Sequence, residues 1–184
     1  TLLRPVASGH AHEPGKVVGS DMFYWTHPNG THGVRGQAFL DYGSDVLTVR
    51  IHCTGLGSAS SQTCGMTKPQ ASLKAFRDCW WKYYGRPETF RSDPEGCFRA
   101  QEHQDALSEL GVYWDPDPGE AYWRHGRIER RIGDLKEKAT KAAQLLPPDV
   151  DLEEMFDEIC HAHNDTVGKS GSSPWQILLG RTPP

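Results

Sequence analysis

Hydrophobic residues recur with two different spacings along the chain, and these spacings predict where strands and helices lie. Three apolar runs separated by turn-forming residues, at 17–25, 37–40 and 46–51, predict an antiparallel meander. Helical spacing then alternates with short apolar runs, which predicts helix 68–84, strand 89–92, helix 98–110 and strand 112–114. A long helix at 120–141 and shorter ones at 152–163 and 173–180 complete the order. This order predicts an α/β fold, with a mixed five-stranded sheet flanked by helices on both faces.

The long helix at 120–141 is the segment around which the rest of the chain is organised. Its apolar residues follow one another at steps of four and three and form one face: Ile128, Ile132, Leu135, Ala139 and Ala142. Glu129 lies on the neighbouring stripe together with Gly126 and Gly133. Each glycine costs about 1 kcal/mol relative to alanine inside a helix, so this stripe is expected to allow close approach of another group.

Turn and loop signals separate these elements. Asn29-Gly30 and Gly33 predict the first turn, and 41–44 the second. The Gly- and Ser-rich segment 53–67 and the Asp-Pro repeat 115–119 are expected to be mobile loops. Ser173, Pro174 and Gly180 predict a capped short helix near the end.

The length of 184 residues fits one domain, with 1–15 as an extended lead-in and 16–184 as the globular part. No run of 18 apolar residues occurs, which argues against a membrane-spanning helix. The five cysteines are widely spaced and odd in number, which favours reduced thiols over a disulfide framework.

The net charge of −4 is mildly unfavourable for a nucleic-acid-binding protein, but the charges are unevenly distributed. Residues 121–141 carry seven basic and three acidic side chains. Residues 149–158 carry six acidic side chains and no basic one, and the role of this acidic segment stays open. The alternative for both segments is an ordinary solvated helix face.

Three carboxylates stand at positions where α/β proteins form sites. Asp21 lies within the first predicted strand, Asp93 follows the fourth, and Glu129 is near the start of the long helix. Gathered together they would repel one another unless cations neutralised them, and carboxylate oxygens suit Mg²⁺ or Mn²⁺. Two such ions about 3.5–4 Å apart are the usual arrangement in enzymes that catalyse in-line phosphoryl transfer.

Five ordered segments resemble the catalytic core of retroviral and LTR-retrotransposon integrases. That family has a ribonuclease-H-like fold and a signature of two aspartates and a glutamate, the last two separated by 35 residues. Here 35 residues, 94–128, separate Asp93 from Glu129. The matching segments are Gly19–Asp21, Phe39–Ser44, Ser92–Phe98, His125–Arg130 and Ala162–Pro183.

The resemblance implies that Asp21, Asp93 and Glu129 are the metal ligands of a polynucleotidyl transferase with two Mg²⁺ or Mn²⁺ ions. Such enzymes trim the 3′ ends of element DNA with water and then join them to target DNA. The residues expected to contact DNA are Arg124, His125, Arg127, Arg130 and Lys136, where His125 stands at a place usually held by Asn.

The resemblance also implies an intracellular protein, in nucleus or cytoplasm, that works as a homodimer or larger homo-oligomer within a retroelement particle or intasome. The family's zinc-binding amino-terminal and DNA-binding carboxyl-terminal domains are expected to lie outside this chain.

Alternatives remain open from the sequence. The chain could be a domesticated or inactive core that acts as a DNA-binding or assembly module, or a related transposase or nuclease on the same fold. Asp41 is interpreted as a hairpin-turn residue in preference to a fourth metal ligand.

Overall fold

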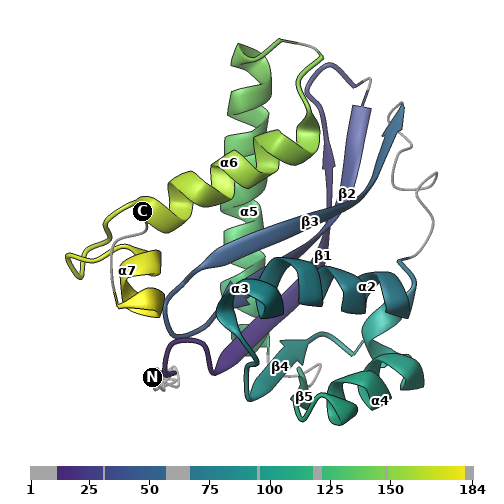
Figure 1. Cartoon of the computed structure of the whole chain (residues 1–184). Coiled ribbons are helices and arrows are strands. Elements are labelled where there is room, and N and C mark those ends of the chain that lie inside the picture. Colours follow the sequence, from purple (N-terminus) through teal and green to yellow (C-terminus); the bar gives the residue numbers. More distant parts are fainter. Residues whose placement is uncertain are drawn as a thin grey trace, which may run out of the picture.

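The computed structural model describes residues 12–30, 32–56, 67–94, 96–117, 122–147 and 149–180, without the side chains of 56 and 122–125. Its centre is one five-stranded sheet in the order β3-β2-β1-β4-β5 (Figure 1). The strands are β1 (Val17–Thr26), β2 (His32–Asp41), β3 (Leu47–Leu56), β4 (Thr89–Ser92) and β5 (Tyr113–Pro116). β1, β2 and β3 pair antiparallel, whereas β4 is parallel to both β1 and β5. The sheet is therefore mixed, as predicted, with β1 in the middle.

One face of the sheet is covered by helices from the middle of the chain. These are α2 (Pro69–Phe76), which continues through a π-helical turn, η1 (Arg77–Trp81), into α3 (Lys82–Tyr84), and then η2 (Gly96–Arg99) and α4 (Gln101–Glu109). Their apolar side chains form a cluster with alternate residues of the sheet, including Val18, Phe39 and Phe90. Phe76, Trp80 and Leu107 are completely buried in it. The predicted helix 68–84 is thus confirmed, and it ends before Gly85, whose φ of 81° suits glycine.

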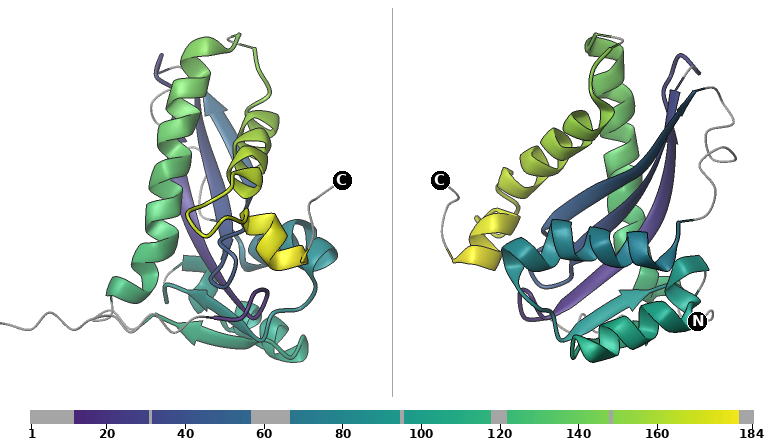
Figure 2. Two further views of the ribbon diagram at one scale, coloured as in Figure 1. Left: turned by 90° about the vertical axis from the view of Figure 1, so that its left-hand side faces the viewer. Right: turned by 45° about the vertical axis from the view of Figure 1, so that its right-hand side comes forward.

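The opposite face carries α5 (Tyr122–Leu145) and α6 (Leu152–Asp165), as Figure 2 shows. The predicted apolar stripe of α5 is confirmed, since Ile128, Ile132, Leu135 and Ala139 are all buried against this face. They pack with Phe23 and Trp25 of β1, whose side chains point away from the first cluster because strand residues alternate between faces. The long helix is therefore fixed over the central strand.

The last helix, α7 (Pro174–Leu179), has the predicted caps at both ends. The Ser173 hydroxyl accepts from the Gln176 amide at 3.3 Å, and the Gln176 side chain accepts from the Ser173 amide at 2.8 Å. Gly180 ends the helix in the left-handed conformation, with φ 67°.

Three boundary predictions are wrong for one reason. Gly33, expected in a turn, lies in β2, the segment 53–56 belongs to β3, and Asp115-Pro116 belongs to β5. In each case pairing with a neighbouring strand supplies hydrogen bonds that outweigh the weak local preference for a turn. The remainder of the two predicted loops, 57–66 and 118–119, lies outside the described residues.

Cysteine chemistry follows the sequence prediction only in part. Cys79, Cys97 and Cys160 are free thiols, as expected, but Cys53 takes part in a disulfide bond. No helix in the described part of the chain combines the length and apolar character needed to cross a membrane.

Candidate active site at the carboxyl ends of β1 and β4

The pairing of two parallel strands brings together the chain segments that carry Asp21 and Asp93. β1 and β4 pair in register through Gly19 and Arg91, and each aspartate lies two residues further along its own chain. Neighbouring strands are about 4.8 Å apart, and residues in register point to the same face. Asp21 shares that face with Phe23 and therefore points toward α5. Two of the three predicted carboxylates therefore follow the last paired residues of β1 and β4 by the same number of positions.

A hydrogen bond far along α5 shows which side of this helix faces β1. The Trp25 indole N–H donates to the Thr140 hydroxyl at 3.1 Å. Thr140 lies about three turns, or ~16 Å, beyond Glu129 on the same helix face. Trp25 lies four residues, or ~13 Å, beyond Asp21 on β1. Because β1 and α5 run in the same direction (Figure 2), Glu129 is at about the level of Asp21.

The other side of α5 is tied to the turn between β2 and β3. Arg127 donates to the Tyr42 carbonyl, and its guanidinium lies 3.4 Å from the Asp45 carboxylate. Arg131 forms an ion pair with the same carboxylate. These contacts and the Thr140 hydrogen bond fix the rotation of the helix about its axis, so that the Glu129 stripe is on the β1 side.

Carboxylate oxygens are the ligands preferred by Mg²⁺ and Mn²⁺, so the chemistry of this donor set fits a hard divalent cation. Glu129 is nevertheless exposed. Across the described residues, no group of three or more His, Cys, Asp or Glu side chains is arranged to hold a metal ion. Asp21 and Asp93 lie on adjacent chain segments, and Glu129 lies on the helix that packs against β1. Their convergence on one site stays a prediction.

The floor beside the aspartates is formed by a buried tyrosine on a strand glycine. A Cβ added at Gly19 would lie 2.5 Å from Cε2 of Tyr42, so only glycine leaves room for this ring. The guanidiniums of Arg91 and Arg127 lie 5.1 and 5.4 Å from the ring centroid. Burial raises the pKa of Tyr42 to about 12, although Arg91 and Arg127 act to lower it. Tyr42 therefore stays protonated and serves as a rigid, neutral surface.

Arg91 is held in place from β5. Its Nε and Nη2 donate to one oxygen of Asp115 at 3.0 and 2.9 Å, and its Nε lies 3.9 Å from Asp117. Both side chains of the Arg91–Asp115 pair are more than four-fifths buried. Sequence reasoning missed this group because Asp115 and Asp117 were assigned to a loop. Gly19 inside a strand was the available signal, since such a glycine often marks close approach of another group.

Asp41 is the turn residue that the sequence predicted. It is completely buried and accepts hydrogen bonds from the Gly15 amide at 2.9 Å, the Ser44 amide at 2.7 Å and the Ser44 hydroxyl at 2.6 Å. These three donors occupy the carboxylate and fix the β2–β3 turn. Asp41 is a structural residue.

The residues predicted to contact DNA fall into three groups. Arg130 is exposed and Lys136 is half-buried on the Glu129 side of α5. Arg127 is engaged with Tyr42 and Asp45. The side chains of Arg124 and His125 lie outside the described residues.

The two glycines of α5 do not pack against another part of the described chain. A Cβ added at Gly126 or Gly133 would meet nothing within 4 Å. The close approach that these residues were expected to allow is therefore not made within the described chain, and the space beside the two glycines is open.

The fold is that of retroviral integrase catalytic cores. No family model matches the chain, and no curated protein matches its sequence. Among solved structures it is similar to the HTLV-2 integrase catalytic core domain in complex with magnesium, with a TM-score of 0.69, 17% identity, and coverage of 90% of this chain and 97% of that one. The BIV integrase catalytic core gives a TM-score of 0.69 at 14% identity, over 90% and 95% of the two chains.

A further neighbour comes from a larger assembly. A chain of the simian T-cell lymphotropic virus intasome in complex with PP2A regulatory subunit B56 gamma gives a TM-score of 0.76 at 16% identity. The match covers 94% of this chain and 57% of that one. The ribonuclease-H-like integrase-core fold predicted from the sequence is thus confirmed.

Proposed function

We propose that the chain is the catalytic core of a metal-dependent DNA integrase, a polynucleotidyl transferase that trims 3′ ends and joins them to target DNA. The observation that carries the proposal is the parallel register of β1 and β4, from which we infer that Asp21 and Asp93 lie beside each other at one end of the sheet. Glu129 lies at the same level on the helix side that faces β1. The 35-residue interval and the integrase-core fold support the same function.

Asp21, Asp93 and Glu129 would hold two Mg²⁺ or Mn²⁺ ions. When bound, such ions activate the attacking oxygen and stabilise the leaving oxygen of an in-line displacement at phosphorus. Asp21 would supply charge from β1 and Asp93 from the segment after β4, whereas Glu129 would supply it from the start of α5. Tyr42 and Arg91 keep the floor beneath them dry and fixed, because both are packed and internally paired.

DNA would lie across the exposed stripe of α5. Gly126 and Gly133 leave this stripe without side chains, so a phosphate backbone can approach it closely. Arg130 and Lys136 flank the stripe and would contact phosphates, together with Arg124 and His125. The Arg127 guanidinium is held by Tyr42 and Asp45, so it would not contact phosphates directly. It would favour DNA binding only through its positive electrostatic potential. Similar cores have been solved in trimeric and dimeric forms, and we propose self-association here too.

A second candidate function is a DNA-binding or assembly module without catalytic activity. One observation favours it: Glu129 is exposed, and the described residues contain no group of three metal-binding side chains.

A disintegration assay on a branched DNA substrate separates the two candidates, because it requires only the core. With Mg²⁺ or Mn²⁺, Asp93→Asn and Glu129→Gln should each lower the rate at least a hundredfold, equivalent to about 3 kcal/mol of transition-state stabilisation. Asp134→Asn is the matched control, since it removes a carboxylate of α5 that pairs only with Arg131 on the helix surface. If parent and Asp93→Asn react alike across a metal titration, the enzymatic proposal fails. If both bind DNA without reacting, the assembly module is the better description.

A further inference from the structure

A buried arginine without a counter-ion lies on the side of the sheet that carries α2. Arg35 of β2 is 6% exposed, and it shares this side with Gln37, which donates to the Ser72 hydroxyl of α2 at 3.0 Å. Arg35 forms no ion pair or hydrogen bond with any described residue, and its Nε is buried without a partner. Burying a charge is costly unless the charge is paired, so this guanidinium indicates a missing anion.

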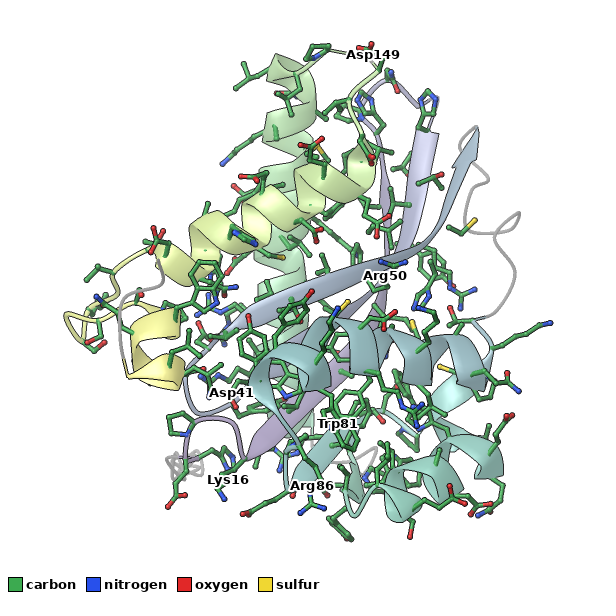
Figure 3. All side chains as sticks on the ribbon, in the orientation of Figure 1. Lys16, Asp41, Arg50, Trp81, Arg86 and Asp149 are labelled. Atoms are coloured by element: carbon green, nitrogen blue, oxygen red, sulfur yellow. The ribbon has the colours of Figure 1, made fainter. Side chains whose placement is uncertain are left out.

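Arg35 lies where β1, β2 and β3 extend past α2. Figure 3 places Arg50 on β3 beside the α2–α3 segment, and the residue that pairs with Arg35, Cys53, is further along the same strand. In that direction the three strands continue beyond the helices of this side (Figure 1). Asp21 points to the other side of the sheet, toward α5. The surroundings of Arg35 are therefore separate from the carboxylate site.

The Tyr24 ring contacts this guanidinium from β1. The two residues are direct neighbours in the β1–β2 register, and the Arg35 Cζ lies 5.3 Å from the ring centroid. A cation–π contact stabilises the charge without using any of the N–H donors of the guanidinium. These donors form a planar fork that matches the oxygens of an oxyanion. Arg35 is therefore held in position while no described residue uses its donors.

A β-bulge brings His52 beside Arg35. Arg35 pairs with Cys53, whereas the next residue, Gly36, pairs with Ile51, so His52 is the extra residue of β3. A bulge changes the direction of the side chain that it carries. Neighbouring strands are about 4.8 Å apart, so the bulge places an imidazole within reach of a group that is bound by the guanidinium.

Gln37 fixes the orientation of the imidazole. Its Nε2 donates to the hydroxyls of Ser20 at 2.9 Å and Ser72 at 3.0 Å, which leaves its Oε1 as an acceptor. The His52 Nε2 lies 3.1 Å from this oxygen and therefore carries the proton of the neutral ring. The Nδ1 is thus the nitrogen at which His52 takes up a second proton.

The charges around His52 are positive. Burial and the guanidiniums of Arg35 and Arg50 lower the pKa of His52 to about 4, so the ring is neutral at pH 7. Arg50 has a partner, since its guanidinium lies 2.8 Å from the Glu153 carboxylate. Only Arg35 of these two arginines lacks a carboxylate among the described residues. An anion beside Arg35 would supply the missing charge and would also favour protonation of His52.

Two further titratable groups on this side of the sheet are neutral. Cys97 and His103 approach Ser72 from η2 and α4. Burial raises the pKa of the Cys97 thiol and lowers the pKa of His103 to about 4. Neither group therefore carries the negative charge that Arg35 lacks.

We propose that Arg35 and His52 form a binding site for a tetrahedral oxyanion of the phosphate class. Arg35 would donate to two oxygens of the anion, and the protonated Nδ1 of His52 would donate to a third. A dianion suits the site better than a carboxylate because the two side chains together supply two positive charges. The anion belongs either to a small molecule or to a phosphorylated side chain of a partner polypeptide. The site is independent of the integrase activity, since none of these residues belongs to the carboxylate site.

The experiment uses the whole chain, without metal or DNA, and follows the imidazole signals of His52 by NMR. Sulfate is the first probe, because it stays a dianion across the pH range of the titration. It should shift the His52 signals and raise the pKa of His52, since a bound anion favours the protonated ring. Its affinity should therefore rise at least fivefold between pH 7 and pH 5. Unchanged His52 signals in saturating sulfate overturn the proposal.

The source of the anion is tested with inorganic phosphate, an acetylated Gly-phosphoserine-Gly amide, and the same peptide with serine. Tighter binding of inorganic phosphate identifies a small-molecule site, and tighter binding of the phosphopeptide identifies a site for a partner's side chain. Equal binding of the serine peptide overturns the proposal. A DNA duplex that shifts the His52 signals at lower concentration than these probes would assign this side of the sheet to nucleic acid and would overturn it too.

Arg35→Gln should weaken sulfate binding at least tenfold. Arg50→Gln is the matched control, because it removes an arginine that is already paired with Glu153, and it should change the affinity less than threefold. Circular dichroism verifies the fold of both variants. His52→Gln provides a second test, since it should remove the rise in affinity between pH 7 and pH 5. Equal effects of the two arginine substitutions, or an unchanged pH dependence in His52→Gln, overturn the proposal.

Discussion

At the scale of single residues, the candidate site depends on small groups that make room for large ones. Gly19 leaves space for the Tyr42 ring, and this ring supports Arg91 and Arg127 on its surface. The carboxylates themselves are ordinary side chains on a strand, after a strand and on a helix. What distinguishes the site is the rigid layer beneath them.

Gly19→Ala should destabilise the protein by about 1–3 kcal/mol, because the new methyl group would force the Tyr42 ring out of its position. Urea denaturation of the single variants and of Gly19→Ala with Tyr42→Leu measures this. The smaller leucine should recover part of the loss, which gives a coupling energy between the two positions. Strictly additive effects would show that ring and glycine are not in contact.

His103 is a second residue whose environment has a measurable effect. It is completely buried beside Phe90 and Phe98, and its Nδ1 has no hydrogen-bond partner among the described residues. Burial lowers its pKa from 6.5 to about 4. Between pH 4 and pH 6.5, His103 is therefore protonated in the unfolded chain but neutral in the folded chain.

The stabilisation linked to neutral His103 should be complete above pH 6.5 and should be lost as the pH falls toward 4. Its size is about 3 kcal/mol by linkage. Denaturant titrations at pH 7 and pH 4.5 measure how much the free energy of unfolding falls on acidification. This decrease should be smaller for His103→Phe than for the parent. His161→Gln, at an exposed position, should behave like the parent. Burial also lowers the pKa of His52 to about 4, so only the difference between variant and parent is informative. An equal decrease in the free energy of unfolding for His103→Phe and the parent would show that His103 does not cause the pH dependence.

At the scale of elements, one residue of the β2–β3 turn holds two helices. Asp45 pairs with Arg127 and Arg131 of α5, and its carbonyl oxygen lies 3.0 Å from Nε2 of His163 on α6. Its φ of 71° is a left-handed conformation that Asp and Asn tolerate better than most residues. The position of Glu129 relative to the sheet thus depends on a turn that is distant in sequence.

Asp45→Asn keeps the size and backbone preference of the side chain but removes its charge. We expect a loss of about 1–2 kcal/mol in the free energy of unfolding, together with faster hydrogen exchange in the first turns of α5. Asp134→Asn, which removes only an exposed i,i+3 pair with Arg131, should cost less than about 0.5 kcal/mol. Similar effects of the two substitutions would mean that Asp45 does not hold the helix.

At the scale of the whole molecule, the site lies where three independently formed parts meet. β1 belongs to the meander, β4 enters the sheet by a crossover, and α5 packs on the meander from one side. Bound metal ions would connect the sheet to the start of α5. Metal binding should therefore be measurable as stability, without any DNA.

Mn²⁺ should raise the melting temperature of the parent protein, by the equivalent of about 2.7 kcal/mol at a concentration of 100 Kd, and a chelator should reverse the effect. Asp21→Asn and Asp93→Asn should abolish the shift, whereas Asp134→Asn should keep it. Differential scanning fluorimetry across a metal titration measures this. An unchanged shift in Asp93→Asn would place the metal elsewhere on the protein.

Local pattern alone predicted most of the element order. The apolar stripe of α5 and the caps of α7 follow from residues within a few positions of one another, and such interactions are visible in the sequence. Predictions were wrong where a distant partner decided the outcome. Asp115 looks like a loop residue until β4 pairs with β5 and Arg91 meets it.

The sequence by itself determined which residues are candidates for the chemistry: two aspartates and a glutamate with the spacing of an integrase core, on a chain able to form a mixed sheet. Only the tertiary structure decided that β1 and β4 pair in parallel, that Tyr42 packs on Gly19 and against Arg91, and that Glu129 is exposed beside open glycines. The physical reason is that strand register, helix rotation and ion pairing are set by contacts between residues far apart in the chain. A one-dimensional pattern does not contain those contacts.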